Sequence, residues 1–219
     1  MALLATDWAT ISSLATAGGT LVLAAATFAA VRSSNRSARL AEIALQEQRR
    51  PLLVQSRLDD AGQKIMFGDQ HWVRVEGGQG TAEHVDGVVY LVMSLRNVGA
   101  GIGVCQGWCV RPGLHRTVAE HFPEDEFRAQ MRDLYIPGGD IGLWQGALRD
   151  ANDPRHGEVA DAVRRREPVA VELLYSDQVG AQRTISRFSL IPFVREEDDA
   201  VSWAVSGTRH WYLDRVGPR

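Results

Sequence analysis

Cysteine is scarce in this sequence, since only Cys105 and Cys109 occur among its 219 residues. They lie four positions apart in a segment that we predict to be a strand, where a rise of about 3.3 Å per residue separates them by about 13 Å. A disulfide needs Cα atoms within about 7 Å, so the two cysteines cannot bridge there. Unbridged thiols are typical of a reducing compartment, and we expect both side chains to pack in the core.

Motifs for the common kinds of catalytic and cofactor site are also missing. The sequence has no GxSxG, GxGxxG, CxxC or P-loop, and none of its six histidines is in HxH or HxxxH spacing. His115, Glu120 and His121 form a loose cluster in a predicted loop, where a structural role is favoured over metal binding. We therefore predict no catalytic, metal-binding or cofactor-binding residue.

Positive charge is scarce in the larger, C-terminal part of the chain. Residues 51–219 carry 19 basic and 24 acidic residues, and Lys64 is the only lysine in the sequence. A nucleic-acid surface needs clustered positive charge. The charge balance therefore argues against nucleic acid as a partner.

One long segment has no charge at all. Residues 8–31 form an uncharged run of 24 residues between Asp7 and Arg32. As a helix, this run spans about 36 Å, enough to cross a hydrocarbon core of about 30 Å. A secretory signal peptide would begin with basic residues, which are absent before Trp8, and a helix buried in a soluble protein would show a charged face. We predict a transmembrane helix over residues 8–31.

The residues that flank this run predict its orientation. Trp8 lies at its start, and Arg32, Arg36 and Arg39 follow its end. Arginines close to a membrane helix are retained in the cytoplasm, so we expect the N-terminus outside and the C-terminal domain inside. The sequence thus predicts a single-pass protein of the inner (cytoplasmic) membrane whose arginines contact lipid headgroups.

Small and hydroxyl side chains recur along one stripe of the uncharged run, including Ser12, Thr16, Gly19 and Thr20. Such a stripe lets a second helix approach closely, so we expect a homo-oligomer or a partner membrane protein to pack there. In the alternative interpretation, the hydroxyls bond only to carbonyls one turn back in their own helix.

Residues 32–50 are rich in helix formers and lack glycine and proline. We predict a juxtamembrane helical linker over this range, after a break near residues 33–35. The helix should stop before Pro51, because the residue that precedes a proline disfavours helical geometry.

After Pro51, apolar and polar residues alternate with the period of a strand. We expect strands at residues 52–57, 64–67, 71–75, 88–96, 104–110, 141–148, 169–175, 184–191 and about 202–213. Residues 123–131 and 154–166 are predicted to be short helical insertions, since each begins with a proline near acidic residues. Many short strands with few helices favour a mainly β domain over residues 51–219, an antiparallel immunoglobulin-like β-sandwich.

Two segments carry a resemblance: LRNVGAGIGV at residues 95–104 and LLYSDQVGAQRTISRFSL at residues 173–190. With Arg50 followed by Pro51 and the uncharged N-terminal run, they make the chain similar to a diverse group of uncharacterised bacterial membrane proteins. That group combines one N-terminal transmembrane helix, a juxtamembrane helix and an immunoglobulin-like sandwich. The resemblance implies this architecture and no particular activity.

Two clusters are candidate partner surfaces. We expect the glycine-rich residues 136–146 to expose Trp144 beside Asp140, and His210 with Trp211 forms a second, weaker candidate. Exposed aromatic side chains mark interaction sites, although packing in the core is the alternative for each tryptophan.

Three hypotheses for function follow. The leading one is a membrane-anchored cytoplasmic interaction or scaffold module without chemistry of its own. The second is a ligand-sensing domain that signals through the juxtamembrane helix, and the third is an enzyme whose site has no recognised motif. A flat aromatic patch would favour the first, an apolar pocket the second, and a pocket with perturbed titratable groups the third.

Overall fold

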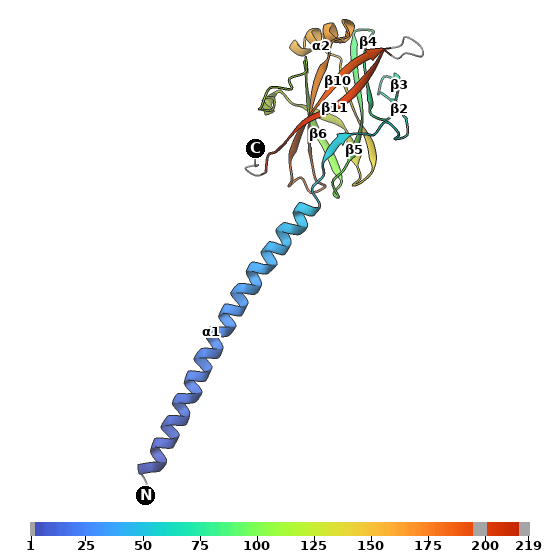
Figure 1. The fold of residues 1–219 in the computed structure, drawn as a ribbon. Helices are drawn as coiled ribbons and strands as arrows, with labels where there is room; N and C mark the ends of the chain where they lie inside the picture. The colour runs from blue at the N-terminus through green and yellow to red at the C-terminus, as the bar shows by residue number, and fades with distance from the viewer. Residues whose placement is uncertain (1–2, 195–200, 215–219) are drawn as a thin grey trace. The chain divides into compact units, whose positions relative to one another are not determined.

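The computed structural model describes residues 3–194 and 201–214, and the chain divides into two compact units, residues 1–47 and 48–219. The first unit is a helix and the second a β-domain (Figure 1). Each is described below by itself.

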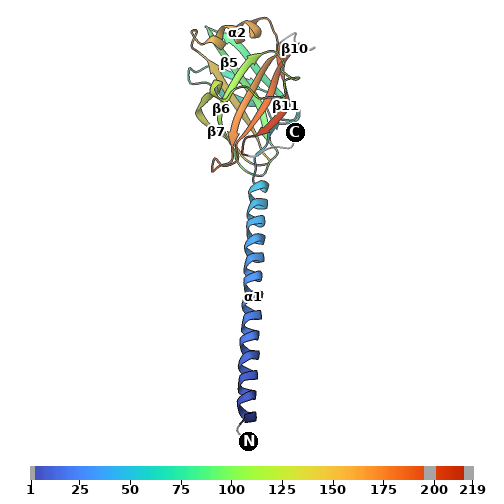
Figure 2. The same ribbon diagram turned by 90° about the vertical axis from the view of Figure 1, so that its left-hand side faces the viewer.

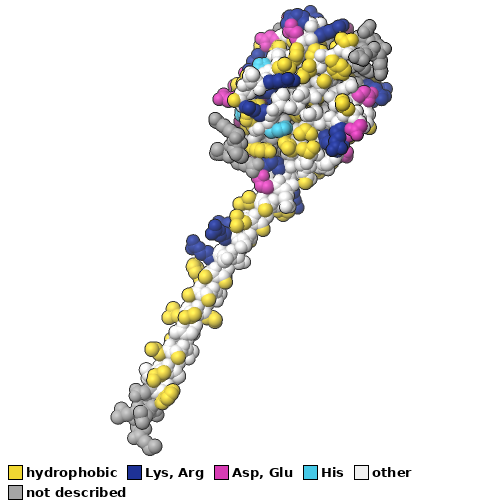
Figure 3. All heavy atoms as spheres, viewed as in Figure 1, with side chains coloured by type: hydrophobic (Ala, Val, Ile, Leu, Met, Phe, Trp, Pro, Cys, Tyr) yellow, Lys and Arg dark blue, Asp and Glu magenta, His cyan; other side chains and the backbone are white. Residues whose placement is uncertain are grey.

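Helix α1 (Leu3–Gln48) is continuous over 46 residues. It contains a segment long and apolar enough to cross a membrane, with a mean hydropathy of 1.8. Its apolar side chains are exposed, and among its described side chains basic ones appear only after the uncharged run, with further apolar ones beyond them (Figure 3). Trp8, Arg32, Arg36 and Arg39, the predicted flanking residues, all lie on this helix with exposed side chains.

The break predicted near residues 33–35 is wrong, because α1 passes through them. Serine and asparagine are weak helix formers, but they keep the main-chain donor that proline would remove, so the strong helix formers around them continue the helix. The helix ends at Gln48, before Pro51, as predicted.

The hydroxyls of the stripe on α1 bond within their own helix. Ser12 donates to the carbonyl of Ala9 at 3.0 Å, Thr16 to that of Ser12 at 2.8 Å, and Thr20 to that of Thr16 at 2.8 Å. These contacts are the ones that the alternative interpretation requires. Packing of a second helix on the stripe at Gly19 stays a prediction.

One antiparallel sheet dominates the β-domain, as the mainly β prediction requires. Its order is β1-β5-β4-β11-β10-β9-β6-β7, with β8 also paired to β5, and a separate hairpin pairs β2 with β3. The strands are β1 (Leu53–Gln55), β2 (Gln63–Met66), β3 (Trp72–Val75), β4 (Gln79–Val85), β5 (Val88–Asn97), β6 (Gly103–Pro112), β7 (Arg128–Ile136), β8 (Ile141–Leu148), β9 (Val169–Ser176), β10 (Thr184–Val194) and β11 (Val201–Tyr212).

The sheet rolls into a barrel (Figures 1 and 2). Strand β8, beyond β5, contacts β7 at the opposite end of the strand order, but the described residues of the two strands form no ladder. An immunoglobulin-like sandwich consists of two facing sheets. It is not confirmed, because nine strands belong to one rolled sheet.

The inside of the barrel holds the main hydrophobic core. In β5, Leu91, Met93 and Leu95 point inward, whereas Tyr90 and Val92 pack outside under the β2–β3 hairpin. The same alternation directs Val169, Val171, Leu173 and Tyr175 of β9 into the core. Period-two alternation thus predicted the faces of both strands correctly.

Helix α2 (Pro154–Arg164) adds a further part of this core through Val159, Ala160, Ala162 and Val163. It begins where predicted, with Asp153 accepting the N–H of Arg155 at 2.9 Å as its cap.

The other predicted helix, over residues 123–131, is wrong. Its proline and acidic residues start only a single 3-10 turn, η1 (Glu124–Glu126), and β7 begins at Arg128. Pairing with β6 satisfies main-chain groups of this segment over a longer range than a short exposed helix could, so the local start signal is overridden.

Irregular pairing between β6 and β7 follows from extra residues in β7, and β6 has one extra residue, Gln106, relative to β9. The register passes from Cys105 opposite Leu134 to Gly107 opposite Ala129, so residues 130–133 of β7 face only Gln106. We call residues 130–133 the β7 bulge.

The extra residue in β6 also turns the two cysteines to opposite faces, with Cys105 in the barrel core and Cys109 outside against Phe122 and Ala170. Both thiols are free, and burial raises the pKa of Cys105 to about 12 and that of Cys109 to about 11.

Asn97 holds the segment through which the chain passes into the β-domain. Its side-chain oxygen accepts the N–H groups of Leu52 and Gly99, both at 3.0 Å. Its side-chain nitrogen donates to the carbonyls of Gly101 at 2.6 Å and Ile136 at 2.9 Å. We call residues 97–103 the junction cradle, because they enclose residues 49–53.

Two glycines of the junction cradle allow this close approach. A Cβ atom at Gly99 would overlap the carbonyl of Arg50, and one at Gly101 would overlap that of Arg49. Arg50 itself is buried and pairs with Asp214 through two contacts of 2.9 and 2.6 Å. The sequence GAG in the resembling segment therefore has a packing role at the junction.

Replacement of Asn97 by Ala tests the junction cradle. Four main-chain groups would lose their partner, and we expect the free energy of unfolding of the β-domain to fall by about 2–4 kcal/mol. Urea unfolding of the full chain in detergent, followed by tryptophan fluorescence, measures this change. The exposed Asn152→Ala is the control, and equal losses for the two variants would contradict the role of Asn97.

Candidate interaction surface

The predicted surface at Trp144 and Asp140 does not form. Trp144 is fully buried, with its ring 5.4 Å from that of Trp108 and its Nε1 donating to Oε1 of Gln130 at 3.1 Å. The glycine-rich context suggested a loop, but residues 141–148 form a strand whose even-numbered side chains point into the barrel. The alternative of core packing is correct for Trp144.

Asp140 lies in the turn between β7 and β8 and is exposed. Its carboxylate accepts the N–H of Ile141 at 2.7 Å, and its carbonyl accepts the N–H of Asn97 at 3.0 Å. Its role is therefore to shape the turn beside the junction cradle.

His210 and Trp211 are neighbours on β11 and so point to opposite faces of the sheet. His210 faces Ser186 and Tyr175, with Nδ1 of His210 2.6 Å from the Ser186 hydroxyl, and burial lowers its pKa. Trp211 faces outward and donates from Nε1 to the carbonyl of Ala119 at 3.0 Å. The structure brings neither residue together with Asp140 or Trp144 in one surface.

A buried ion pair that the sequence did not predict lies under Trp211. Glu172 of β9 and Arg187 of β10 are cross-strand partners with 0% and 1% of their surface exposed. The guanidinium of Arg187 donates to one Glu172 oxygen from Nε at 2.7 Å, and the N–H of Phe122 donates to the other at 2.8 Å. Burial raises the pKa of Glu172, while the N–H of Phe122 and the charge of Arg187 oppose that shift.

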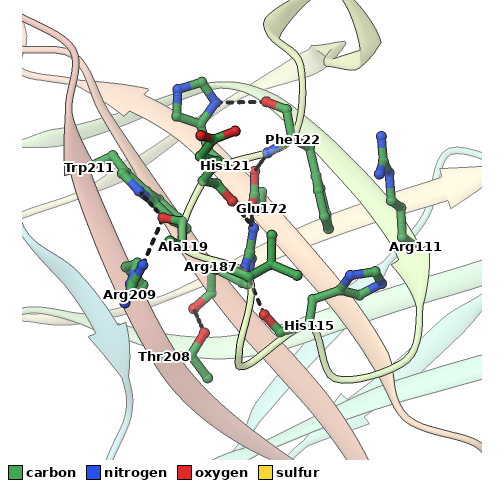
Figure 4. Close-up of polar contacts among 12 residues, drawn as sticks. Arg111, His115, Ala119, His121, Phe122, Glu172, Arg187, Thr208, Arg209 and Trp211 are labelled. Carbon is green, nitrogen blue, oxygen red and sulfur yellow. Dashed lines mark hydrogen bonds and ion pairs between the residues drawn. The ribbon is translucent and has the colours of Figure 1, made fainter.

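Arg187 also fixes the loop over residues 113–122 (Figure 4). It donates to the carbonyls of His115 at 2.8 Å, Val118 at 2.9 Å and Glu120 at 2.6 Å. Both oxygens of Glu172 are engaged and no part of its side chain reaches solvent. This cluster is therefore a clamp for the loop and offers no group to a ligand.

The seam between β7 and β8 has the opposite character, because its main-chain groups lack strand partners. The carbonyl of Gln145 accepts the side-chain N–H of Gln130 at 3.2 Å, which shows that this residue directs its main-chain groups toward β7. In an antiparallel pair, main-chain groups alternate between the two edges, so Leu143 and Ala147 present theirs to β7 as well. The β7 bulge keeps β7 from completing this ladder.

Gln130 takes the place of the missing strand partner. Its side-chain amide accepts from Nε1 of Trp144 and donates to the carbonyl of Gln145. Gln145 as a whole residue is only 9% exposed, and its Oε1 is buried without a hydrogen-bond partner. It is one of five buried side-chain atoms of the described residues without such a partner, whereas buried acceptors are usually satisfied in folded proteins.

A groove of about 750 Å³ opens along the seam. Its walls include Trp108, Gln130, Met131, Gln145 and Ala147, with Phe67 and Asp69 from the β2–β3 turn. Met131, in the β7 bulge, is 96% exposed. We call this the seam groove.

Three arginines line the seam groove: Arg128, Arg132 and Arg149. Arg128 pairs with Asp153 and Arg149 with Asp69 at 3.0 Å. None of the ion pairs among the described residues includes Arg132, which is exposed. With Asp69 as the sole acidic residue of the lining, the seam groove favours a ligand with negative charge.

Sequence reasoning missed the seam groove because residues 123–131 were interpreted as a helix. A bulge leaves no signal in the hydrophobic pattern of β7, whose residues are mostly exposed.

Comparisons with known proteins add no constraint: no family model, no curated protein and no solved structure matches this chain. Within residues 3–194 and 201–214, no group of three or more His, Cys, Asp and Glu residues could hold a metal ion.

Replacement of Arg187 by Met tests the clamp. The change would leave Glu172 buried without its charged partner, and we expect unfolding free energy to fall by about 3–5 kcal/mol. Tryptic cleavage after the exposed Arg116 should accelerate, because the loop loses three of its anchors. The surface pair Arg183–Glu124 provides the control, since Arg183→Met should cost less than about 1 kcal/mol. Unchanged cleavage after Arg116 would contradict the clamp.

Proposed function

We propose that this chain is a single-pass membrane protein whose β-domain binds a protein partner at the cytoplasmic face of the inner membrane. The seam groove carries this proposal, because it combines unpaired main-chain groups, an exposed methionine and an unsatisfied buried acceptor in one place. Flexible methionines suit surfaces that receive other proteins. A binding or scaffold role without chemistry of its own fits these features best.

Membrane attachment is supported by α1, whose apolar part has exposed side chains and is followed by Arg32, Arg36 and Arg39. The charge asymmetry supports a cytoplasmic β-domain. We also propose that the chain shares this helix-plus-β-domain arrangement with the bacterial membrane proteins that it resembles.

A ligand-sensing role is the second candidate, and one contact favours it. The turn between β7 and β8 bonds directly to the junction cradle, since the N–H of Gly139 donates to the carbonyl of Asn97 at 2.8 Å. Asn97 in turn holds Leu52 at the start of the β-domain. Through these hydrogen bonds, a ligand in the seam groove would change the conformation of the segment that joins the domain to α1.

A reporter fused after Arg219 tests the orientation. We expect green fluorescent protein to fluoresce and alkaline phosphatase to be inactive in that position, because the β-domain stays in the cytoplasm. Replacing Arg32, Arg36 and Arg39 together by Ala should raise the inverted fraction. Strong phosphatase activity of the unaltered chain would contradict the proposed topology.

A photo-crosslinking amino acid at position 131 tests the partner surface in intact membranes. We expect it to join the full chain to another protein, because Met131 lines the seam groove and is exposed. The control position is Val179, which is 81% exposed in the turn between β9 and β10. Absence of an adduct at position 131, or equal adducts at both positions, would count against the seam groove as the binding surface.

A further inference from the structure

The seam groove lies along an edge of β8 that has no strand partner among the described residues. A paired strand would supply main-chain N–H and C=O groups along β8. Here the Gln130 side chain donates one N–H to the carbonyl of Gln145, and its oxygen accepts from the side chain of Trp144. Toward Ala147, the described residues of β7 offer no ladder to β8. An extended peptide has the repeat that such an edge accepts.

Gln145 provides the second observation. This residue is only 9% exposed and lines the groove, and its Oε1 has no hydrogen-bond donor. A main-chain N–H of a strand lying in the groove is a donor of the required kind. An extended peptide could therefore bond both to this side chain and to the free edge of β8.

Charge selects among extended peptides. Arg128 and Arg149 are paired with Asp153 and Asp69. Arg132 has no ion-pair partner among the described residues, so the unpaired positive charge of the groove is its guanidinium. Guanidinium groups bind carboxylates through paired hydrogen bonds. An acidic side chain on the peptide would therefore find a partner that a basic side chain would not.

Resting on the proposed function, we propose that the seam groove binds an extended segment of a partner protein that carries an acidic side chain and lies as an added strand beside β8. The Gln145 side chain, whose Oε1 is buried in the free domain, turns toward the groove and accepts a main-chain N–H of the segment. The carboxylate of the segment pairs with Arg132. Met131 covers the apolar side of the bound segment.

The test uses the full chain in detergent and a panel of labelled eight-residue peptides of alternating Thr and Val. One Glu occupies each position in turn, and matched peptides carry Lys at the same position. A third set is N-methylated at alternate residues, which removes main-chain donors from one edge. Fluorescence anisotropy measures the dissociation constants.

We expect Glu peptides to bind at least about tenfold more tightly than Lys peptides, and N-methylation of one edge to abolish binding while that of the other edge has little effect. Gln145→Leu should weaken binding about tenfold, the size of one hydrogen bond. It should keep the fold, since it removes an unsatisfied acceptor. Arg132→Glu should reverse the preference between Glu and Lys peptides.

Gln178→Leu and Arg183→Glu are matched controls, both in the segment between β9 and β10, and should leave binding unchanged. Equal binding of N-methylated and unmodified peptides, or binding that Gln145→Leu does not alter, would overturn the proposal. If no peptide binds but position 131 still crosslinks to another protein, the added-strand inference is wrong and the proposed function stands. An adduct between two copies of this chain would identify a second copy as the occupant and also overturn the inference.

Discussion

A barrel made from one rolled sheet must satisfy the main-chain groups at the line where its two ends meet, and this constraint shapes the β-domain. Here the line falls between β7 and β8, which contact each other without pairing. Four residues of β7 oppose one residue of β6 at the β7 bulge. This irregularity prevents the main chain of β7 from pairing with that of β8. The side-chain amide of Gln130 replaces one hydrogen bond of the missing ladder, and the rest of the unpaired edge of β8 borders the seam groove.

Buried polar side chains in this domain fall into two kinds. Asn97 and Arg187 have their groups fully engaged, and each fixes a loop against the sheet. Gln145 is 9% exposed, and its Oε1, like four other buried side-chain atoms of the described residues, has no hydrogen-bond partner. A buried polar group with all its hydrogen bonds formed stabilises the fold, whereas one without a partner destabilises it until a donor binds. That contrast separates the clamp at Arg187 from the seam groove.

Strand positions could be predicted well from the sequence, because alternating apolar residues report directly on a half-buried strand. The predicted ranges near β5, β8, β9 and β10 agree closely with the structure. Strands β4 and β7 were missed for one reason. Their inward positions hold small or few apolar residues, such as Gly80 and Ala82 in β4, and the pattern is too weak to register.

The candidate surface could not be predicted in the same way. The glycine-rich surroundings of Trp144 favoured exposure of its ring. In the structure, Gly146 leaves room for the rings of Trp144 and Trp108 against the main chain, because a Cβ atom there would overlap them. Glu172 and Arg187 have opposite charges on strands whose pairing the sequence does not reveal. The seam groove depends on a register shift and on strands distant in sequence, and neither leaves a local signal.

Amide hydrogen exchange of the full chain in lipid bilayers tests the open seam most directly. If β8 has a free edge, the amide of Ala147 should exchange at least about tenfold faster than that of Val171 in β9, which has a strand on both sides. Protection of Ala147 equal to that of Val171, in the absence of any partner, would show that the seam is closed and would contradict the account.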